Sequence, residues 1–240
     1  AMKNRLTRIN EFISAHAICL DVEWPLYLRI GASMAKKDYW LPEAYDEDDR
    51  VPRPLNILNV WLHRVFARGS FDRGGRHYGA WWQLIPKEFR PYILIDGQAT
   101  SELDFSELHP RMMYASAGID SPEGDLYDIW LPKDKVIADR SDPHYNKRRK
   151  IIKRYINAKI NDEFGRFRMK KSDYALLGLT RSQLQRRIFK KHPILHEVIN
   201  SGKGLEYQYL DSEIADKVML KLMDQEIVCL PVYDSFIVQT

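Results

Sequence analysis

The stretch SELDFSELHPRMMYASAG, residues Ser101–Gly118, joins a strand pattern to a helix pattern and leaves an aspartate where the two meet. Leu103 and Phe105 alternate with polar residues, which predicts a strand with one apolar face and one polar face. Ser106 can then cap a helix that runs to the end of the stretch. Asp104 is therefore expected at a strand end, where α/β and α+β sheets often carry their chemistry. The alternative is an ordinary turn aspartate.

The composition indicates a folded protein that could accept a polyanionic partner. The chain has 240 residues, 45% of them hydrophobic and 12% aromatic, which is enough for the core of one large domain or of a domain with a smaller subdomain. The formal net charge is +4. Basic residues concentrate in NKRRKIIKR (146–154) and TRSQLQRRIFKKH (180–192), although such runs are often only solvated helix faces.

The two cysteines and the hydropathy pattern suggest a cytoplasmic protein. Cys19 and Cys229 stand in apolar surroundings without a CxxC pair, which is typical of buried thiols in a reducing compartment. No apolar run has the length of a membrane span, so we expect no membrane partner. The apolar section near the start is too short for a signal peptide and contains His16.

The hydrophobic periodicity predicts an α+β fold. Helical spacing occurs over residues 2–20 and 54–69, the latter with Leu55, Leu58, Leu62 and Phe66 on one stripe. Residues 92–106 indicate a hairpin with Asp96-Gly97 as its turn. Residues 119–200 are helical and basic and resemble an insertion between two halves of a sheet.

The last segment predicts an amphipathic helix that leads into a second hairpin. Asp211 is a plausible cap of this helix, which spans residues 211–226. The following segment IVCLPVYDSFIV is apolar but is interrupted around Asp234. Pro231 lacks a backbone donor and therefore favours an edge strand or a bulge.

Three clusters of residues point to phosphoryl chemistry. Asp104 at the end of one predicted strand and Asp234 at the turn of a later hairpin suit a hard cation such as Mg²⁺. Arg149, Lys153 and Asn157 recur every four residues, so they line one stripe of a helix that could hold a triphosphate. A solvated amphipathic helix is the alternative for this stripe.

The third cluster is FDRGGRHYGAWWQLIPKEFR, residues 71–90. Its two glycines, flanked by Arg73 and Arg76, allow close approach to a phosphate backbone. The tryptophan pair and Gln83 could contact a base or a sugar. The tryptophans could equally belong to the core.

Several of these stretches resemble the motifs of template-directed polymerases. LDFSELHPRMMY (103–114) is similar to motif A, combining features of family A and family B DNA polymerases. RKIIKRYINA (149–158) resembles motif B of bacteriophage-type single-subunit RNA polymerases, and LPVYDSFIV (230–238) resembles motif C. FDRGGRHYG (71–79) is similar to a further element of the phage-type enzymes. The matches follow the order of these families and cover residues 71–240.

The resemblance implies a role for each candidate residue. Asp104 and Asp234 would be the catalytic ligands of two Mg²⁺ ions, or Mn²⁺ as the alternative, with help from the Phe105 carbonyl. Arg149 and Lys153 would hold the incoming nucleoside triphosphate, and Lys153 would also protonate the pyrophosphate. Asn157 lies on the same stripe.

The resemblance also implies contacts to the sugar and to the nucleic acid. His109 takes the place of the residue that excludes the ribose 2′-hydroxyl, which favours dNTPs, whereas Ser235 after Asp234 is typical of the RNA-polymerising branch. Arg73, Arg76 and Gln83 would touch template or primer. Tyr233 would lie near the primer terminus.

The implied fold is a polymerase palm-like antiparallel sheet with a basic, helical, fingers-like insertion and N-terminal helices. Residues 71–118 and 201–240 would form the palm-like core, residues 119–200 the insertion, and residues 1–70 a thumb-like or accessory region. The implied function is a minimal DNA polymerase of replication or repair that extends a primer on a DNA template, with RNA as an alternative partner.

Three alternatives remain open. The first is a single-subunit RNA polymerase or primase-like enzyme. The second is a palm-like nucleic-acid-binding module without turnover, which the lack of a Tyr-Gly pair after motif B favours. The third is a metal-dependent nuclease, which requires a further acidic ligand or a general base near Asp104.

Overall fold

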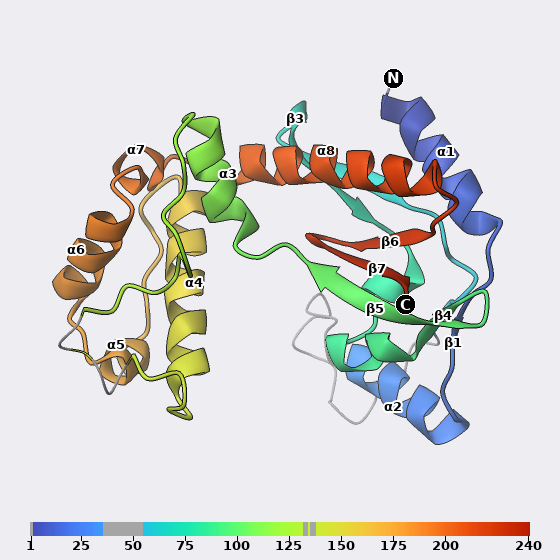
Figure 1. Cartoon of the computed structure of the whole chain (residues 1–240), viewed down its shortest axis with the longest axis horizontal. Helices are drawn as coiled ribbons and strands as arrows, with labels where there is room; N and C mark the ends of the chain where they lie inside the picture. Colours follow the sequence, from blue (N-terminus) through green and yellow to red (C-terminus); the bar gives the residue numbers. More distant parts are fainter. Residues whose placement is uncertain (1, 36–54, 132–133, 135–137) are drawn as a thin grey trace, which may run out of the picture. The chain divides into compact units, whose positions relative to one another are not determined.

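The computed structural model of the chain describes residues 2–35, 55–131, 134 and 138–240. These residues form two compact units, one of residues 1–106 and 209–240 and one of residues 107–208 (Figure 1). The predicted insertion 119–200 therefore belongs to a longer unit. The described part of residues 1–70, predicted as a thumb-like or accessory region, belongs to the unit that contains the sheet.

The first unit is built around a five-stranded sheet with the strand order β1-β4-β5-β7-β6. All four pairings in this sheet are antiparallel. The strands are β1 (Ile18–Leu20), β4 (Ile93–Ile95), β5 (Gln98–Asp104), β6 (Cys229–Val232) and β7 (Ser235–Gln239). The antiparallel sheet and the surrounding helices confirm the predicted α+β class.

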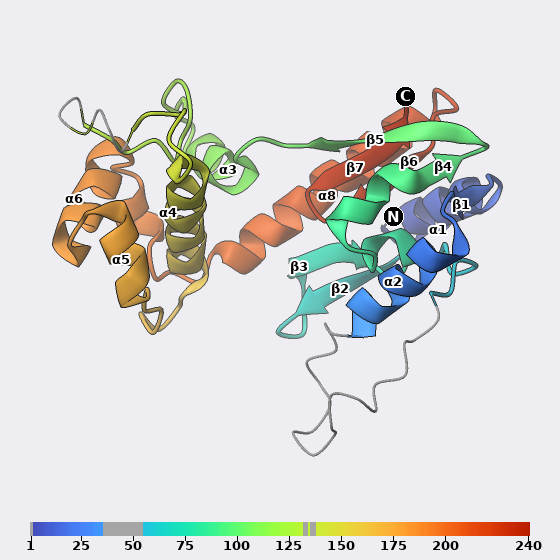
Figure 2. The same cartoon turned by 90° about the horizontal axis from the view of Figure 1, so that it is seen from below.

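Helices and a separate hairpin complete this unit. They are α1 (Met2–Ser14), α2 (Trp24–Ala35), β2 (His63–Ala67), β3 (Ser70–Tyr78), the 3-10 helices η2 (Trp81–Gln83) and η3 (Lys87–Tyr92), and α8 (Gly204–Met223) from residue 209 onward. Helix α8 runs along the sheet (Figures 1 and 2). Ile9 and Ile13 of α1 and Met219 of α8 share one buried core with Leu230 and Ile237 of the sheet.

Two turn signals in the sequence predicted the sheet correctly. Asp96 and Gly97 connect β4 to β5 with φ angles of 51° and 74°, the left-handed conformation that suits a two-residue hairpin. Pro231 lies on β6, which is an edge strand of the sheet. Its position agrees with the absence of a backbone donor in proline.

The helix expected over residues 54–69 is wrong. Residues 63–67 form β2, which pairs with β3 across a tight turn at Arg68 and Gly69, both with positive φ. Leu55 and Leu62 are buried as expected, but Leu58 is 84% exposed. The apolar residues that matched a helical period therefore lie on a loop and a strand. The tight turn after β2 favours a hairpin instead of a helix.

Two predicted helix caps also differ from the structure. The helix after β5 is α3 (Leu108–Ser116), and its cap position is Glu107, with φ 59° and no side-chain capping bond, rather than Ser106. Asp211 lies inside α8, which begins seven residues earlier at Gly204. Instead of capping the helix, the buried side chain of Asp211 forms an ion pair with Arg76.

The second unit is helical, as its sequence predicted. Its helices are α3, α4 (Tyr145–Asn161), α5 (Lys171–Leu177), α6 (Arg181–Lys191), α7 (Leu195–Val198) and the first residues of α8. Helix α4 buries Ile152, Ile156 and Ile160, the apolar stripe expected from their spacing of four. Thr180 and Gln183 form a reciprocal capping box at the start of α6.

The two cysteines are expected to differ sharply in reactivity. Cys229 is buried in β6 as expected, and burial raises the pKa of its thiol to about 12, but the expectation of burial is wrong for Cys19, which is exposed. Because the thiolate is the reactive species, a thiol reagent at pH 8 should modify one cysteine in the native protein and both in denaturant. The number of protein thiols that react in Ellman's assay measures this difference. Rapid modification of Cys229 in the native protein would contradict the packing around β6.

Candidate functional site

The structure brings Asp104 and Asp234 together on neighbouring segments of the sheet. Asp104 is the last residue of β5 and pairs with Ser235, the first residue of β7. Asp234 directly precedes Ser235, in the turn that connects β6 to β7. The amide of Phe105 lies 3.5 Å from the carbonyl oxygen of Asp234. Asp104 is exposed and Asp234 half-buried, so both carboxylates stand at one rim of the sheet.

Tyr233 shapes the turn that carries Asp234. Its φ angle is 59°, a left-handed conformation that a bulky residue rarely adopts and that marks a constrained position. Its ring packs edge to face on Tyr78 of β3, with 5.6 Å between the centroids. The aromatic contact compensates part of the backbone strain and ties the turn to the β2–β3 hairpin.

Glu102 is a carboxylate of the site that the sequence analysis left without a role. It lies two residues before Asp104 on the same face of β5. Arg90 donates to it at 2.8 Å, and the hydroxyl of Ser235 donates to it at 2.7 Å. The alternation of residues along the strand, which places Glu102 on the same face as Asp104, was the sequence signal that could have identified it. Glu102 thereby fixes Ser235, the residue that pairs with Asp104.

Arg76, expected to contact template or primer, is ion-paired within the first unit. Its guanidinium binds Asp211 of α8, with Nε 3.0 Å from Oδ2. Burial alone would lower the pKa of Arg76, but Asp211 and, more weakly, Asp234 raise it. Its positive charge therefore acts on the Asp234 carboxylate. Arg73 lies half-buried on the same strand, β3.

Gln83 and the tryptophan pair belong to the core. Trp81 and Trp82 are fully buried, and Gln83 is 7% exposed. The amide nitrogen of Gln83 donates to the carbonyls of His77 and Pro231, both at 3.0 Å, and the indole of Trp82 also donates to Pro231. These contacts fix the outer edge of β6. We therefore do not retain Gln83 as a nucleic-acid contact.

The paired aspartates suit a magnesium site that is completed by its substrate. Among the described residues, no group of three or more His, Cys, Asp or Glu side chains is placed to hold a metal ion. Mg²⁺, however, often takes only one or two protein carboxylates and completes its shell with water and substrate phosphates. Asp104 and Asp234 provide two, and the exposed rim leaves room for the remaining ligands.

The second unit carries the predicted triphosphate stripe on α4. Lys153 is exposed, and Arg149 and Asn157 are half-buried on the same side of the helix. Lys153 forms no ion pair with any residue that the structure describes. The Oδ1 atom of Asn157 is buried and, among the described residues, has no hydrogen-bond donor. The stripe and the two aspartates belong to different units.

Arg149 is held by acidic residues that the sequence analysis did not connect with it. Its Nε donates to Asp125 at 2.5 Å, and its Nη2 lies 3.3 Å from Glu107. The guanidinium also stacks over Tyr127, 5.1 Å from the ring centroid. A triphosphate that bound Arg149 would therefore share it with Asp125. The partners lie 24 and 42 residues away, and no local pattern indicates them.

Burial and hydrogen bonding shift the pKa values of Glu107 and Asp125 in opposite directions. Burial raises the pKa of Glu107, and its hydrogen bond with Asp125 raises it further. Burial opposes ionisation of Asp125 as well, but hydrogen bonds from Arg149, Glu107 and the Tyr127 amide lower its pKa to about 2. Asp125 is thus the charged partner of Arg149.

Replacing Asp125 with asparagine should destabilise the second unit at neutral pH. The pKa of Asp125 lies below the value of about 3.9 in an unfolded chain, so its ionised form favours folding above about pH 4. This contribution is lost as the pH falls towards 2. We expect a loss of about 1–2 kcal/mol at pH 7, after allowing for solvent screening, and a smaller difference at pH 3.

Urea unfolding at the two pH values measures this effect. The exposed Asp120 in the same unit supplies the matched control, since Asp120→Asn makes the same charge change without removing a described ion pair. Equal effects of the two substitutions at pH 7 would contradict the ion pair.

His109 lies half-buried in the first turn of α3. Its ring is tilted against Tyr207, with 6.4 Å between the centroids. Both residues belong to the second unit. The ring contact restricts the imidazole, which fits a residue that limits space, but its relation to a sugar remains a prediction.

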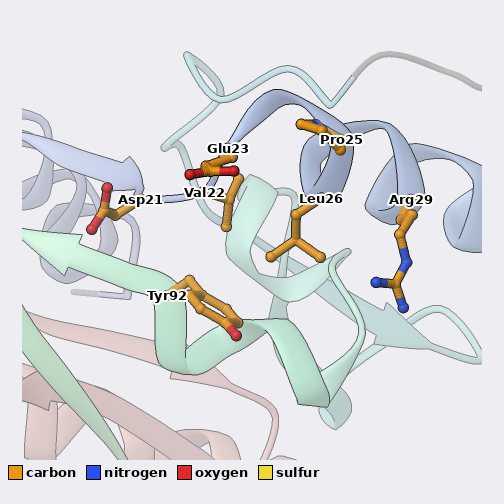
Figure 3. A pocket seen from close by; sticks show the side chains of 7 residues that line it. All are labelled: Asp21, Val22, Glu23, Pro25, Leu26, Arg29 and Tyr92. Carbon is orange, nitrogen blue, oxygen red and sulfur yellow. The ribbon is translucent and has the colours of Figure 1, made fainter.

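The first unit also contains a hollow of about 460 Å³ that does not include the paired aspartates (Figure 3). Asp21 and Glu23 lie at one side of it and Arg29 at the other, with Leu26 and Tyr92 between them. Its mixed charges do not favour a phosphate. We assign no ligand to it.

No protein-family model, curated protein or solved structure matched the chain. Within the described ranges, no helix combines the length and the apolar character needed to cross a membrane.

Proposed function

We propose that the chain is a template-directed nucleotidyltransferase that extends a DNA primer with dNTPs in the presence of Mg²⁺. The observation that carries the proposal is the pairing of β5 with β7, which makes Asp104 and Asp234 neighbours at one rim of an antiparallel sheet. These are the aspartates of the stretches that resemble motifs A and C. A strand beside a hairpin, each with one aspartate, is the arrangement that the resemblance implies.

In this proposal, Asp104 and Asp234 hold two Mg²⁺ ions, and the Phe105 carbonyl assists. The bound ions supply charge neutralisation for in-line displacement at a phosphate. The primer 3′-hydroxyl attacks the α-phosphate, a new P–O bond forms, and pyrophosphate leaves. Glu102 keeps Ser235 oriented beside Asp104, which limits the freedom of the turn that carries the second carboxylate.

Lys153 and Arg149 divide the work of holding the triphosphate. Lys153 is exposed and forms no described ion pair, so its ammonium can bind the phosphates and give a proton to the leaving pyrophosphate. Arg149 is already positioned by Asp125, which orients its fork. Asn157 can accept a hydrogen bond through its buried Oδ1 atom. His109 would select deoxyribose over ribose.

Arg73, Arg76 and Tyr233 are proposed to lie along the nucleic acid. Tyr233 directly precedes Asp234 in the turn between β6 and β7. The charge of Asp234 raises the pKa of Arg76. Arg76 is held by Asp211, so its contact with a phosphate would be made by a guanidinium that is already fixed in direction.

Primer extension tests the proposal. A labelled primer annealed to a longer DNA template, or to an RNA template, is incubated with the chain and Mg²⁺, and dNTPs are compared with NTPs. Extension with dNTPs is the expected result. Extension with NTPs alone would assign the RNA polymerase or primase-like alternative. Tight primer–template binding without extension, in Mg²⁺ and in Mn²⁺, would overturn the proposed enzymatic activity. The alternative of a palm-like nucleic-acid-binding module would then stand.

A further inference from the structure

A loop of the second unit, residues 125–129, determines the direction of the Arg149 side chain. The Asp125 carboxylate accepts from Nε at 2.5 Å and from Nη2 at 3.1 Å, so it occupies one side of the guanidinium. The ring of Tyr127 lies against the same guanidinium, with 5.1 Å between its central carbon and the ring centroid. The Tyr127 amide also donates to Asp125 at 2.9 Å, which fixes the carboxylate itself. The orientation of Arg149 therefore depends on where this loop lies.

One nitrogen of this guanidinium is left for a ligand. Asp125 and Glu107 take hydrogen bonds from Nε and Nη2, whereas Nη1 makes none with any residue that the structure describes. The Arg149 side chain is 30% exposed. A phosphate could therefore bind at Nη1 while the carboxylates keep the other two nitrogens in place.

The backbone of the loop is fastened to the end of α6. The Nζ atom of Lys191, the last residue of α6, donates to the Asp125 carbonyl at 2.6 Å and also to the Asp128 carbonyl. The Nε2 atom of His192 lies 2.6 Å from the Leu126 carbonyl. Because a carbonyl can only accept, Nε2 carries the proton. Two consecutive residues thus hold three carbonyls of one short loop.

Two further hydrogen bonds support this attachment. The Tyr114 hydroxyl lies 2.8 Å from Nδ1 of His192. Burial lowers the pKa of His192, so the ring is neutral at pH 7 and Nδ1 accepts from Tyr114. The amide of Leu126, a fully buried residue, donates to Glu107 at 2.8 Å. Residues of α3 and α6 therefore hold the backbone of the loop at both its N–H and its C=O groups.

We propose that Lys191 and His192 are positioning residues of the nucleotide site, because they hold the loop that directs Arg149. This role rests on the proposed function, in which Arg149 binds the triphosphate of a dNTP. An arginine that was free before it bound an anion would lose much of its side-chain entropy on binding. Here the loop imposes that loss when the protein folds, so the nucleotide does not have to supply it. Neither positioning residue contacts the nucleotide.

Equilibrium titration of the chain with the fluorescent nucleotide mant-dATP tests this role. The mixture contains Mg²⁺ but no primer or template, so no turnover occurs. Lys191→Met removes the hydrogen bonds to the loop and keeps most of the apolar stem, and we expect it to weaken affinity about fivefold to twentyfold. Lys190→Met is the matched control, since Lys190 is the exposed neighbour on α6 and makes no hydrogen bond within the described part of the chain. It makes the same charge change and should alter affinity less than about twofold.

A double-mutant cycle with Arg149→Met separates positioning from a general loss of structure. If Lys191 acts through Arg149, Lys191→Met should have no further effect on affinity once Arg149 is replaced. Tyr114→Phe is a milder variant for the case that Lys191→Met does not fold. It removes only the hydroxyl that supports His192, so it should weaken affinity about twofold to threefold, and this effect should also vanish when Arg149 is replaced.

The outcomes separate the positioning role from the proposed function. If Arg149→Met abolished binding of mant-dATP but Lys191→Met bound it as Lys190→Met does, the positioning role would be wrong and the nucleotide site would stand. Independent, additive losses in Lys191→Met and Arg149→Met would also overturn the positioning role. Failure of the wild-type chain to bind mant-dATP would overturn the nucleotide site and the positioning role together.

Discussion

Asp104→Asn and Asp234→Asn are each expected to abolish primer extension, with a loss of at least about a thousandfold, or about 4 kcal/mol of transition-state stabilisation. Asparagine keeps the size of the side chain and removes the charge that would hold a divalent cation. Asp104 is exposed and Asp234 half-buried at the sheet rim, so the fold should tolerate both changes. The rate of extension at saturating dNTP, measured with primer–template affinity and Tm, separates chemistry from binding and folding.

The matched control for these variants is Asp224→Asn. Asp224 lies in the same unit, its side chain is 70% exposed, and it makes a loose ion pair with Arg8 at 3.8 Å. The control should extend the primer at the wild-type rate. If either rim variant kept a tenth of the wild-type rate, the two-carboxylate mechanism would be wrong for this chain.

The sequence predicted the fold well wherever a local signal decided the structure. The Asp96-Gly97 turn, the edge position of Pro231 and the apolar stripe of α4 all follow from chemistry within a few residues. The helix expected over residues 54–69 failed because four apolar residues matched a helical period by chance. The strand there is defined by its pairing with β3, and hydrophobic periodicity carries no information about pairing between strands.

The candidate site was predictable only in part, for the same physical reason. Asp104 could be named because it closes a recognisable strand, and Asp234 because it interrupts an apolar segment at a turn, but the register that joins them emerged only with the sheet. The partner of Arg149 could not be predicted, since Asp125 reaches it from a loop 24 residues away. The partner of Arg76 could not be predicted either, since Asp211 is 135 residues away along the chain.

Another set of such long-range contacts surrounds Arg64. Its side chain is 2% exposed, and its Nη1 lies 2.8 Å from Glu213 and 3.2 Å from Asp216. It also donates to Ser212 at 2.5 Å and to the Gly75 carbonyl at 2.6 Å. The guanidinium therefore fastens the β2–β3 hairpin to α8, the helix that also holds Arg76 through Asp211.

Arg64→Met is expected to destabilise the first unit by about 3–5 kcal/mol. The substitution keeps much of the apolar stem but leaves buried carboxylates and a backbone carbonyl without their donor, and an uncompensated buried charge is costly. Arg5 also binds Glu213 and Asp216, so it limits the loss without abolishing it. Urea unfolding followed by the fluorescence of the buried Trp81 and Trp82 reports on this unit.

Arg8→Met provides the comparison for this loss. Arg8 lies on α1 in the same unit, and its side chain is 60% exposed, so its removal should change the free energy of unfolding by less than about 0.5 kcal/mol. Arg64→Met should also slow primer extension at temperatures where the protein stays folded, because a loosened hairpin no longer presses Tyr78 against Tyr233. If Arg64→Met were as stable as Arg8→Met, the buried network would not be what joins the hairpin to α8, and the aromatic contact alone would have to position the turn that carries Asp234.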